Sequence, residues 1–358
     1  MVELYLRRQD FIASELIDNF ETLVWTERFS SSGEFNLTCR YSNLLWGALN
    51  RYGQQYLSNT DSPVLMMVEN LEIKNQKGSS QDLIQISGRE FSSFLENRSN
   101  KTRSTTEPIV ITDTPMGIVK YLIDRYAINV ATAGAENVIN NLSVALTPTA
   151  QPSTTQAIDR GDLYSQLTAL CDSYNFGFST MLDVSDNTVT IYLLEGTDYT
   201  VWTPGAYSYR EFSPDLENLR DVSVLKSKQA FKNHARILSG RGDIGTDYYL
   251  PGFSSTVANT DRRTLVVEAR DIGTDPALTD DQVRDLLKLR GAIELATINN
   301  RFVDYVSGDI PVDANAGLGN IVMVKGKTGE PIKSQITEMI TTIDGSGKKK
   351  KPTFTAVA

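Results

Sequence analysis

The segment Thr279–Lys327 reads TDDQVRDLLKLRGAIELATINNRFVDYVSGDIPVDANAGLGNIVMVKGK and organises the rest of the chain. Its first half predicts a helix, because Thr279 can cap the N-terminus and Gln282 lies where a capping box places Glu or Gln. Asp280 and Asp281 fall in the first turn, where the helix dipole favours negative charge. The apolar positions that recur at helical spacing, and that we expect to be buried, are Leu286, Leu289, Ile293 and Ala296.

The second half of this segment changes from helical to alternating periodicity after Asn300. Phe302–Val306 and Ile321–Val324 predict two strands, and Gly308–Gly319 predicts a long loop between them. A helix of this length is not stable alone in water. We therefore expect it to lie on a sheet to which the neighbouring strands contribute.

The bulk composition is that of a folded, acidic, multidomain protein. A chain of 358 residues exceeds what one core usually organises, so we expect two to four domains. Hydrophobic residues make up 40% and charged residues 22%, which is typical of globular proteins. The net charge of −9 argues against a protein that grips nucleic acid by its phosphates, since such binding needs clustered Lys and Arg.

The cysteines and the N-terminus indicate a protein made and kept in a cytosol until something larger carries it elsewhere. Cys39 and Cys171 are far apart and match no metal spacing, and they do not predict a disulfide framework. Arg7 and Arg8 lie in an alternating pattern with no apolar stretch behind them, so we predict no signal peptide. No apolar run approaches the length of a membrane span.

The first third of the chain predicts an antiparallel sheet. The alternating or apolar sets are Val2, Leu4 and Leu6; Leu23 and Trp25; Phe35 and Leu37; and the runs Val64–Val68, Leu71–Ile73 and Leu83–Ser87. Ser30–Gly33 and Gln76–Ser80 predict turns, whereas Leu44–Leu57 predicts a short helical excursion. Because Asn97–Glu107 is polar and rich in Ser and Thr, we expect residues 1–104 to form one β-barrel or β-sandwich domain.

Residues 105–205 predict a small α+β domain. Thr114-Pro115 predicts one helix start and Asp162 can cap a second helix. The positions expected to be buried on these helices are Val119, Leu122, Ile123, Tyr126, Leu163, Leu167, Leu170 and Tyr174. Phe176–Leu182 and Val189–Leu194 predict a hairpin, and Ala131–Gln156, which is rich in Ala, Thr and Pro, predicts an irregular segment.

Residues 206–358 predict a second β-barrel domain with a loop and helix region inserted at residues 241–301. The expected strands outside the Thr279–Lys327 segment are Asn218–Leu225, His234–Leu238, Leu265–Ala269, Lys333–Ile343 and Thr353–Val357. Gly242–Asn259 predicts a loop rich in Tyr and Gly. Gly345–Lys351 predicts the tip of the last hairpin, where the basic run Lys348–Lys351 is expected to be solvated.

Candidate motifs for chemistry are better explained as structural features, so we predict no catalytic, cofactor or metal residues. His234 is the one histidine, lies in a predicted strand and matches no triad or zinc spacing. Gly326-Lys327-Thr328 lacks the earlier Gly of a phosphate-binding loop and predicts a hairpin turn.

Short acidic and receptor-like motifs also have ordinary explanations. Asp309 and Asp313 lack the spacing of a calcium loop and fit turn chemistry. Arg241-Gly242-Asp243, a tripeptide that some cell-surface receptors bind, is expected to be a chance match in a Gly-rich turn.

A resemblance to a known family rests on motifs in a fixed order. The runs 262–272 (RRTLVVEARDI), 278–297 (LTDDQVRDLLKLRGAIELAT) and 309–326 (DIPVDANAGLGNIVMVKG) resemble the closing part of the baseplate-hub or minor tail proteins of long-tailed actinobacteriophages. Residues 23–39 (LVWTERFSSSGEFNLTC) resemble the opening strands of that family. This family is similar in turn to the hub proteins of contractile tails.

Single positions extend the resemblance. Gly88-Arg89-Glu90-Phe91, followed by Arg98, resembles the end of the family's first domain, and Asn218-Leu219 and Asn233 fit the family's Asn positions. Asn320 departs from the pattern, because the family often has an acidic residue there.

The resemblance implies a β-rich α+β structural virion protein at the tail tip, with two antiparallel β-barrel or sandwich hub domains, an intervening small α+β domain and an inserted helix region. It implies a homotrimer that closes the distal end of the tail tube and opens for DNA ejection. The implied partners are the distal tail protein ring, the tape-measure protein C-terminus and a central tail fibre. No membrane span and no specific nucleic-acid binding are implied, although DNA passes through the channel.

Two alternative functions are open at this point. A tail-associated peptidase or cell-wall hydrolase would need a catalytic extension, and the chain ends at Ala358, just after the last predicted hairpin. A receptor- or carbohydrate-binding tail-tip module would use exposed aromatic residues, for which Tyr248, Tyr249 and Phe253 are the candidates.

Overall fold

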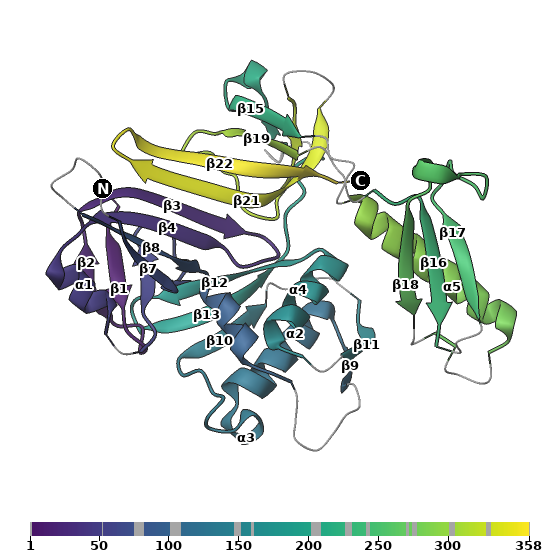
Figure 1. Ribbon diagram of the computed structural model, residues 1–358, viewed down its shortest axis with the longest axis horizontal. Coiled ribbons are helices and arrows are strands. Elements are labelled where there is room, and N and C mark those ends of the chain that lie inside the picture. The colour runs from purple at the N-terminus through teal and green to yellow at the C-terminus, as the bar shows by residue number, and fades with distance from the viewer. Residues whose placement is uncertain are drawn as a thin grey trace. The chain divides into compact units, whose positions relative to one another are not determined.

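The computed structural model of the chain is shown in Figure 1. It describes residues 2–51, 53–74, 82–100, 109–146, 152–158, 161–201, 209–225, 231–240, 244–269, 272–273, 278–300, 305–326 and 331–357. The chain divides into a larger unit of Met1–Val222, Ser307–Pro331 and Gln335–Phe354, and a smaller unit of Ser223–Val306, Ile332–Ser334 and Thr355–Ala358. The expected β-rich α+β fold is confirmed.

The N-terminal part of the larger unit is built from strands. They are β1 (Leu4–Arg7), β2 (Ala13–Ile17), β3 (Phe20–Arg28), β4 (Glu34–Arg40), β5 (Tyr56–Asn59), β6 (Met66–Met67), β7 (Asn70–Lys74) and β8 (Leu83–Arg89). The helix α1 (Asn43–Leu49) precedes β5, and the 3₁₀ helix η1 (Phe91–Asn97) follows β8. The helical excursion expected at Leu44–Leu57 is therefore shorter than predicted, because its end pairs as β5 with β1.

A long sheet joins the two ends of the sequence. The C-terminal strands are β19 (Tyr305–Asp309), β20 (Ile321–Val324), β21 (Ile332–Asp344) and β22 (Gly347–Ala356), and β14 (Glu211–Phe212) and β15 (Arg220–Leu225) precede them with the 3₁₀ turn η3 (Pro214–Leu216). The strand order of this sheet is β15-β19-β22-β21-β3-β4-β8-β7, with β20 pairing β14 and β21. The residues at 23–28 pair antiparallel with those at 338–343, so the first and third predicted domains share one sheet.

The middle of the chain forms a helical layer against a small sheet in the larger unit (Figure 1). Its elements are β9 (Ile109–Asp113), α2 (Pro115–Ile123), the π-helical turn η2 (Asp124–Ile128), α3 (Val130–Ala133), β10 (Leu142–Leu146), β11 (Thr154–Ile158), α4 (Leu163–Tyr174), β12 (Gly177–Asp183) and β13 (Thr188–Leu194). The helix start predicted at Thr114-Pro115 is confirmed, with the Thr114 hydroxyl capping α2, and the Asp162 carboxylate caps α4, as predicted. The predicted irregular segment Ala131–Gln156 is wrong in part, because it contains β10, which pairs in parallel with β13.

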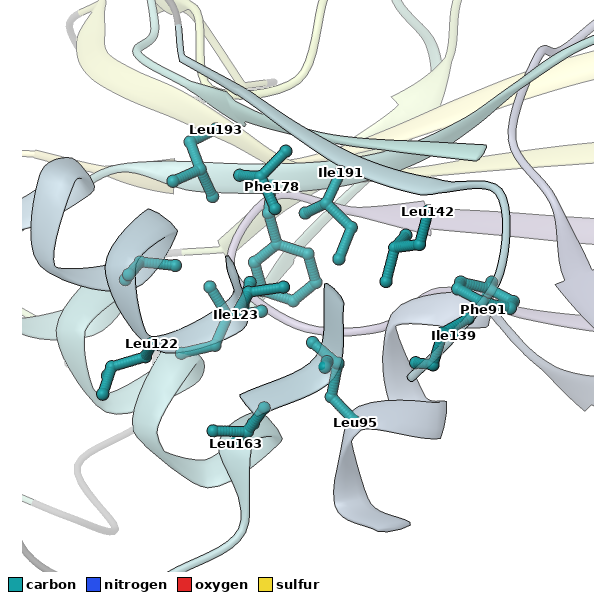
Figure 2. Close-up of a cluster of buried hydrophobic side chains, with 14 of the residues drawn as sticks. Phe91, Leu95, Leu122, Ile123, Ile139, Leu142, Leu163, Phe178, Ile191 and Leu193 are labelled. Atoms are coloured by element: carbon teal, nitrogen blue, oxygen red, sulfur yellow. The ribbon is translucent and has the colours of Figure 1, made fainter. Parts of the chain in front are cut away.

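One core fills the space between these middle helices and strands. Figure 2 shows Leu122 and Ile123 of α2, Leu142 of β10 and Phe178 of β12 pointing toward a common interior, and all four are buried. Phe91 and Leu95 of η1 enter the same core. The predicted buried faces of α2 and α4 are confirmed, except that Tyr174 is half-buried.

The smaller unit is a three-stranded sheet with one long helix on its face (Figure 1). It contains β16 (His234–Ser239), β17 (Gly245–Tyr249), the short turn η4 (Asn259–Asp261), β18 (Thr264–Ala269) and α5 (Asp280–Asn300). The strand order is β17-β16-β18, with β16 antiparallel to β17 and parallel to β18. The segment Gly242–Asn259 was predicted as a loop, but β17 lies within it.

The predicted capping box of α5 is confirmed, whereas the predicted buried stripe is wrong at Leu286, Leu289 and Ile293; the side chain of its fourth residue, Ala296, lies outside the described part of the structure. The Thr279 backbone N–H donates to Gln282 Oε1 at 2.9 Å, and the Gln282 N–H donates back to Thr279 Oγ1 at 3.4 Å. Leu286, Leu289 and Ile293 are 42%, 59% and 54% exposed. The helix instead buries Val283, Leu287 and Leu295, because the strands β16 and β17 contact its opposite face.

Other sequence predictions have mixed outcomes. Phe302 and Val303, and the turn at Gln76–Ser80, lie outside the described residues. The loop predicted at Gly308–Gly319 begins later, because β19 runs to Asp309 and Ile310 bridges to Lys350. The prediction that the basic run Lys348–Lys351 lies in a loop tip is wrong, because these residues belong to β22. Cys39 and Cys171 are buried and free, and no helix in the described parts is both long and apolar enough to cross a bilayer.

Candidate functional site

Glu90 joins three segments of the larger unit through its buried carboxylate. Its Oε1 accepts from the Thr180 backbone N–H and from Thr180 Oγ, both at 2.6 Å, and its Oε2 accepts from the Gly33 N–H at 3.2 Å. The Glu90 backbone N–H in turn donates to the Gly33 carbonyl at 2.9 Å. The acidic position that resembles the family motif therefore ties η1 to the β3–β4 turn and to β12.

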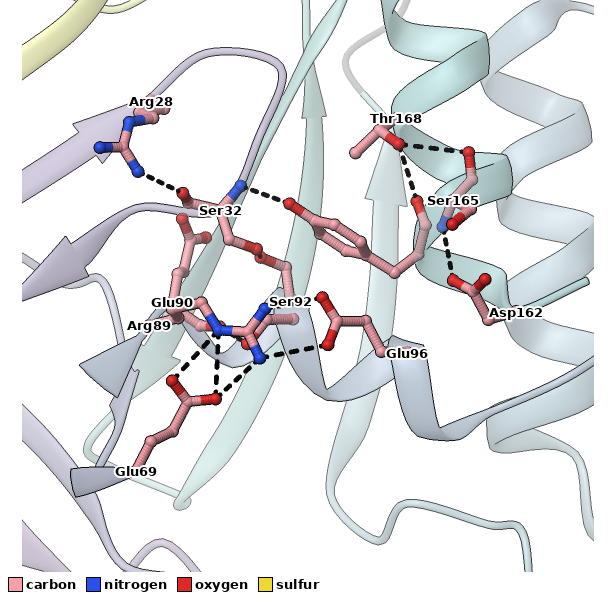
Figure 3. Close-up of polar contacts among 12 residues, drawn as sticks. Arg28, Ser32, Glu69, Arg89, Glu90, Ser92, Glu96, Asp162, Ser165 and Thr168 are labelled. Carbon is pink, nitrogen blue, oxygen red and sulfur yellow. Dashed lines mark hydrogen bonds and ion pairs between the residues drawn. The ribbon is translucent and has the colours of Figure 1, made fainter. Parts of the chain in front are cut away.

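A second set of contacts braces the same turn from the middle of the chain (Figure 3). The Tyr164 hydroxyl on α4 accepts from the Ser32 backbone N–H at 2.9 Å, and the Ser32 and Ser92 hydroxyls lie 2.8 Å apart. Arg28 donates to the Ser32 carbonyl at 3.0 Å. The β3–β4 turn is thus held from η1, α4 and β12 at once.

The other motif residues also have structural partners. Arg89 donates to both Glu69 and Glu96 (Figure 3). Its Nη2 lies 2.9 Å from Glu69 Oε1 and its Nη1 lies 2.7 Å from Glu96 Oε1. Arg98 donates from Nε to the Asn137 carbonyl at 2.6 Å, across to the middle segment. Arg89 and Arg98 therefore anchor the chain on either side of η1.

The three asparagine positions each clamp a turn. Asn218 accepts from the Ser213 N–H and donates to the Glu211 carbonyl, and Asn233 accepts from the Arg263 N–H and donates to the Asp261 carbonyl. Asn320, which departs from the acidic family pattern, accepts from the Thr197 N–H at 3.1 Å. An amide oxygen supplies the same acceptor as a carboxylate, so the departure leaves this contact intact.

Burial raises the pKa of Glu90 to about 7, and the nearby carboxyl of Glu27 raises it further, whereas the hydrogen bonds from Thr180 and Gly33 lower it. Burial also raises the pKa of Glu27, whose Oε1 accepts from Ser62 Oγ at 2.6 Å. The larger unit therefore holds two acidic groups whose charged forms are disfavoured by their surroundings.

Replacing Glu90 with Gln should flatten the pH dependence of stability. The ordinary pKa is 4.5 and the folded value is about 7, so between these limits the folded chain binds more protons than the unfolded chain. The free energy of unfolding of the parent must then fall as pH rises through this window, by up to about 3 kcal/mol from this group. The difference between parent and Glu90→Gln in denaturant titrations at several pH values reports this contribution, including its interaction with Glu27.

Glu72→Gln is the matched control, because Glu72 is exposed on β7 and should leave the parent profile unchanged. Parallel stability profiles of the parent and Glu90→Gln across the window would contradict the assignment of Glu90.

A cavity of about 370 Å³ lies in the larger unit between β3, the β12–β13 hairpin and β21–β22. Its apolar wall includes Leu23, Trp25 and Met339. At its polar rim, Lys348 Nζ lies 2.5 Å from Asp61 Oδ2. The basic run predicted to be solvated thus begins with a lysine that pairs with the N-terminal segment.

His234 has a structural environment rather than that of a catalytic base. Its ring is buried in β16, with Nδ1 3.0 Å from Thr264 Oγ1 and Nε2 3.1 Å from Arg262 Nη2 and 3.2 Å from Asp247 Oδ1. Burial and the Arg262 charge lower the pKa of His234, against the opposing effect of Asp247. The ring holds β16 to its two neighbouring strands.

The remaining candidate positions are placed as follows. Among the described residues no group of His, Cys, Asp and Glu side chains could hold a metal ion. Arg241-Gly242-Asp243 and Lys327-Thr328 lie outside the described residues. Tyr248 packs against the core of the smaller unit, and the ring centroids of Tyr249 and His234 lie 4.8 Å apart. Of the three aromatic candidates, Phe253 is the exposed one.

Comparison with protein families gives one match over nearly the whole sequence. Residues 3–354 match the model of the siphovirus ReqiPepy6 Gp37-like protein family. The chain belongs to this family. A comparison with curated proteins found no match. The resemblance to phage tail proteins expected from the sequence motifs is confirmed.

Solved structures share the fold of this Gp37-like protein at low sequence identity. A tail protein from Neisseria meningitidis MC58 has a TM-score of 0.60 and 12% identity, covering 99% of this chain and 96% of that one. The 43 kDa tail protein of prophage MuSo2 from Shewanella oneidensis has a TM-score of 0.59 and 13% identity, covering 98% and 97%. The prophage tail protein gp18 from Listeria monocytogenes has a TM-score of 0.53 and 8% identity, covering 98% and 94%. The fold is therefore that of phage tail proteins along its full length.

Proposed function

We propose that this Gp37-like protein is the baseplate hub of a siphovirus tail tip. In this role a homotrimer closes the distal end of the tail tube and opens for DNA ejection. The observation that carries the proposal is the family match over residues 3–354, together with a tail-protein fold that covers 96–97% of two solved tail proteins. The protein is then a structural virion component made in the host cytoplasm.

The bracing of the larger unit supports a mechanical role. Residues of β3 and β21 pair along one sheet, and Arg28 Nε donates to Glu338 Oε2 at 2.8 Å beside that pairing. Glu90 and Tyr164 connect the β3–β4 turn to the middle segment. Segments from all three predicted domains are thus tied together, which suits a part that transmits force. The boundaries at 104 and 205 stay predictions.

The partners follow from the same proposal. A hub docks on the distal tail protein ring, contacts the tape-measure protein C-terminus and supports a central tail fibre. The net charge of −9 supports a channel through which DNA passes without specific binding, because an acidic protein repels phosphates. We also propose that the protein is not an enzyme, since its single histidine is buried among Thr264, Arg262 and Asp247.

Imaging of the assembled tail tip tests the proposal. We expect three copies of the chain below a six-fold ring, with both predicted β domains at similar radius. The interface per chain should be on the order of 2,000 Å² or more, as in obligate oligomers. Six copies, or one β domain hanging free of the ring, would refute the hub assignment.

A further inference from the structure

The helix α5 carries apolar residues on two opposite faces. Its inner face packs on the sheet of the smaller unit, and Val283, Leu287 and Leu295 there are fully buried. The fit is close at Gly291, where an added Cβ would lie 2.5 Å from Ile237 Cδ1. Because each residue turns the helix by about 100°, the exposed Leu289 lies roughly opposite the buried Leu287.

The outer apolar residues have the spacing of a coiled-coil seam. Leu286, Leu289 and Ile293 are separated by three and then four residues, which corresponds to consecutive a, d and a positions of a heptad. All three are large aliphatic side chains that are 42% or more exposed. Such a stripe on the outside of a well-packed helix predicts a helical partner.

The charges beside the stripe indicate which partner this is. Asp285 precedes Leu286 at a g position, and Arg290 follows Leu289 at the next e position. In a parallel, in-register pair of identical helices, g of one copy faces this e of the other, so Asp285 meets Arg290. An antiparallel pair would instead bring Asp285 near Asp285 and Arg290 near Arg290, which is unfavourable.

We propose that the outer face of α5 packs against the α5 helices of other copies of this chain, parallel and in register, through Leu286, Leu289 and Ile293. Within one copy, Asp285 and Arg290 are five residues apart and face different sides of the helix. They pair instead with Lys288 at 3.2 Å and Glu294 at 2.9 Å. These exposed pairs contribute little and can exchange for contacts between copies.

The inference goes beyond the proposed function, because it stands on α5 alone. It assigns self-association to a surface of the smaller unit, whatever contacts the β domains make. It also explains why Leu286, Leu289 and Ile293 have the spacing of a buried helix face and are nevertheless exposed in the single chain.

Disulfide trapping of the full-length chain tests the seam. The native thiols give little background, because Cys39 and Cys171 are buried, and burial raises the pKa of Cys39 to about 12 and that of Cys171 further. Under mild oxidation in concentrated solution, Leu289→Cys should form a covalent dimer about tenfold more than Lys288→Cys. Lys288 is the matched control, because it is an exposed neighbour that lies off the seam. Equal trapping at the two positions, or none at Leu289→Cys, would overturn the inference.

A charge-reversal cycle tests the parallel arrangement separately. Asp285→Arg and Arg290→Asp should each reduce trapping through Leu289→Cys, because like charges then face one another across the seam. The double variant should restore trapping, since the opposite pair is re-formed between copies and not within one helix. Restoration that fails, while each variant keeps the parent Tm, would overturn the parallel register.

The outcome is independent of the hub proposal. Three copies in the tail tip without trapping at Leu289→Cys would remove the α5 seam and leave the hub standing. Trapping at Leu289→Cys together with six copies in the tail tip would support the α5 seam and refute the hub.

Discussion

Replacing Leu287 with Asp should unfold the smaller unit. Leu287 is fully buried between α5 and the β16–β18 sheet, within a cluster that includes Ala235, Ile237 and Val267. An unpaired carboxylate there loses its hydration without gaining a partner, at a cost of about 5 kcal/mol, which is comparable to the whole stability of a small domain. Hydrogen exchange should show loss of protection in β16 and α5, while the strands of the larger unit stay protected.

Leu289→Asp is the matched control on the same helix, two residues away. Because Leu289 is 59% exposed in the single chain, the new carboxylate stays hydrated there, and the Tm of the dilute, unassociated chain should be within a degree or two of the parent. Unfolding by Leu289→Asp but not by Leu287→Asp would mean that the helix faces are assigned the wrong way round.

Replacing Gly88 with Ala should strongly destabilise the larger unit. A Cβ at Gly88 would lie 1.7 Å from the Met67 carbonyl oxygen and 3.0 Å from the Glu69 backbone nitrogen. Because both are backbone atoms, no change of side-chain rotamer can relieve this clash. β8 would have to move from its pairing with β4, where Gly88 faces Phe35. We expect a loss of about 3 kcal/mol or more in the free energy of unfolding, measured by denaturant titration.

Gly47→Ala is the control for the Gly88 substitution. Gly47 lies in α1, and an added Cβ there meets nothing within 4 Å. Alanine has the higher helix propensity, so this variant should gain about 0.5 to 1 kcal/mol. If Gly88→Ala matched the parent in stability, the close approach of β8 to Met67 would not restrict this position as the geometry requires.

Several elements could be predicted from the sequence because their signals are local. The helix start at Thr114-Pro115 and the caps at Asp162 and Thr279 depend on residues within the first turn of the helix that they start. The strands β4 and β13 alternate buried residues with more exposed ones, so the period of two in their sequences is sufficient to predict them. The prediction that Ala131–Gln156 is irregular was wrong in part, because β10 in this segment pairs in parallel with a strand more than 40 residues further along the chain.

The structural roles of the motif residues could not be predicted from their spacing. The sequence marks Glu90 as an acidic residue between a strand and a short helix, but Thr180, which donates two hydrogen bonds to it, lies 90 residues further along the chain. His234 shows the same limit, because its partners Asp247, Arg262 and Thr264 come from strands or turns that only the fold brings together.

By itself, the sequence determined the β-rich α+β class, the capped helices and the membership in a phage tail protein family. The tertiary structure alone decided which face of α5 is buried. Leu287 and Leu289 are the same residue type on one helix, and periodicity favours the stripe that contains Leu289. Leu287 is buried because β16 and β17 supply apolar partners on that side, and burial depends on what lies opposite a side chain rather than on the side chain itself.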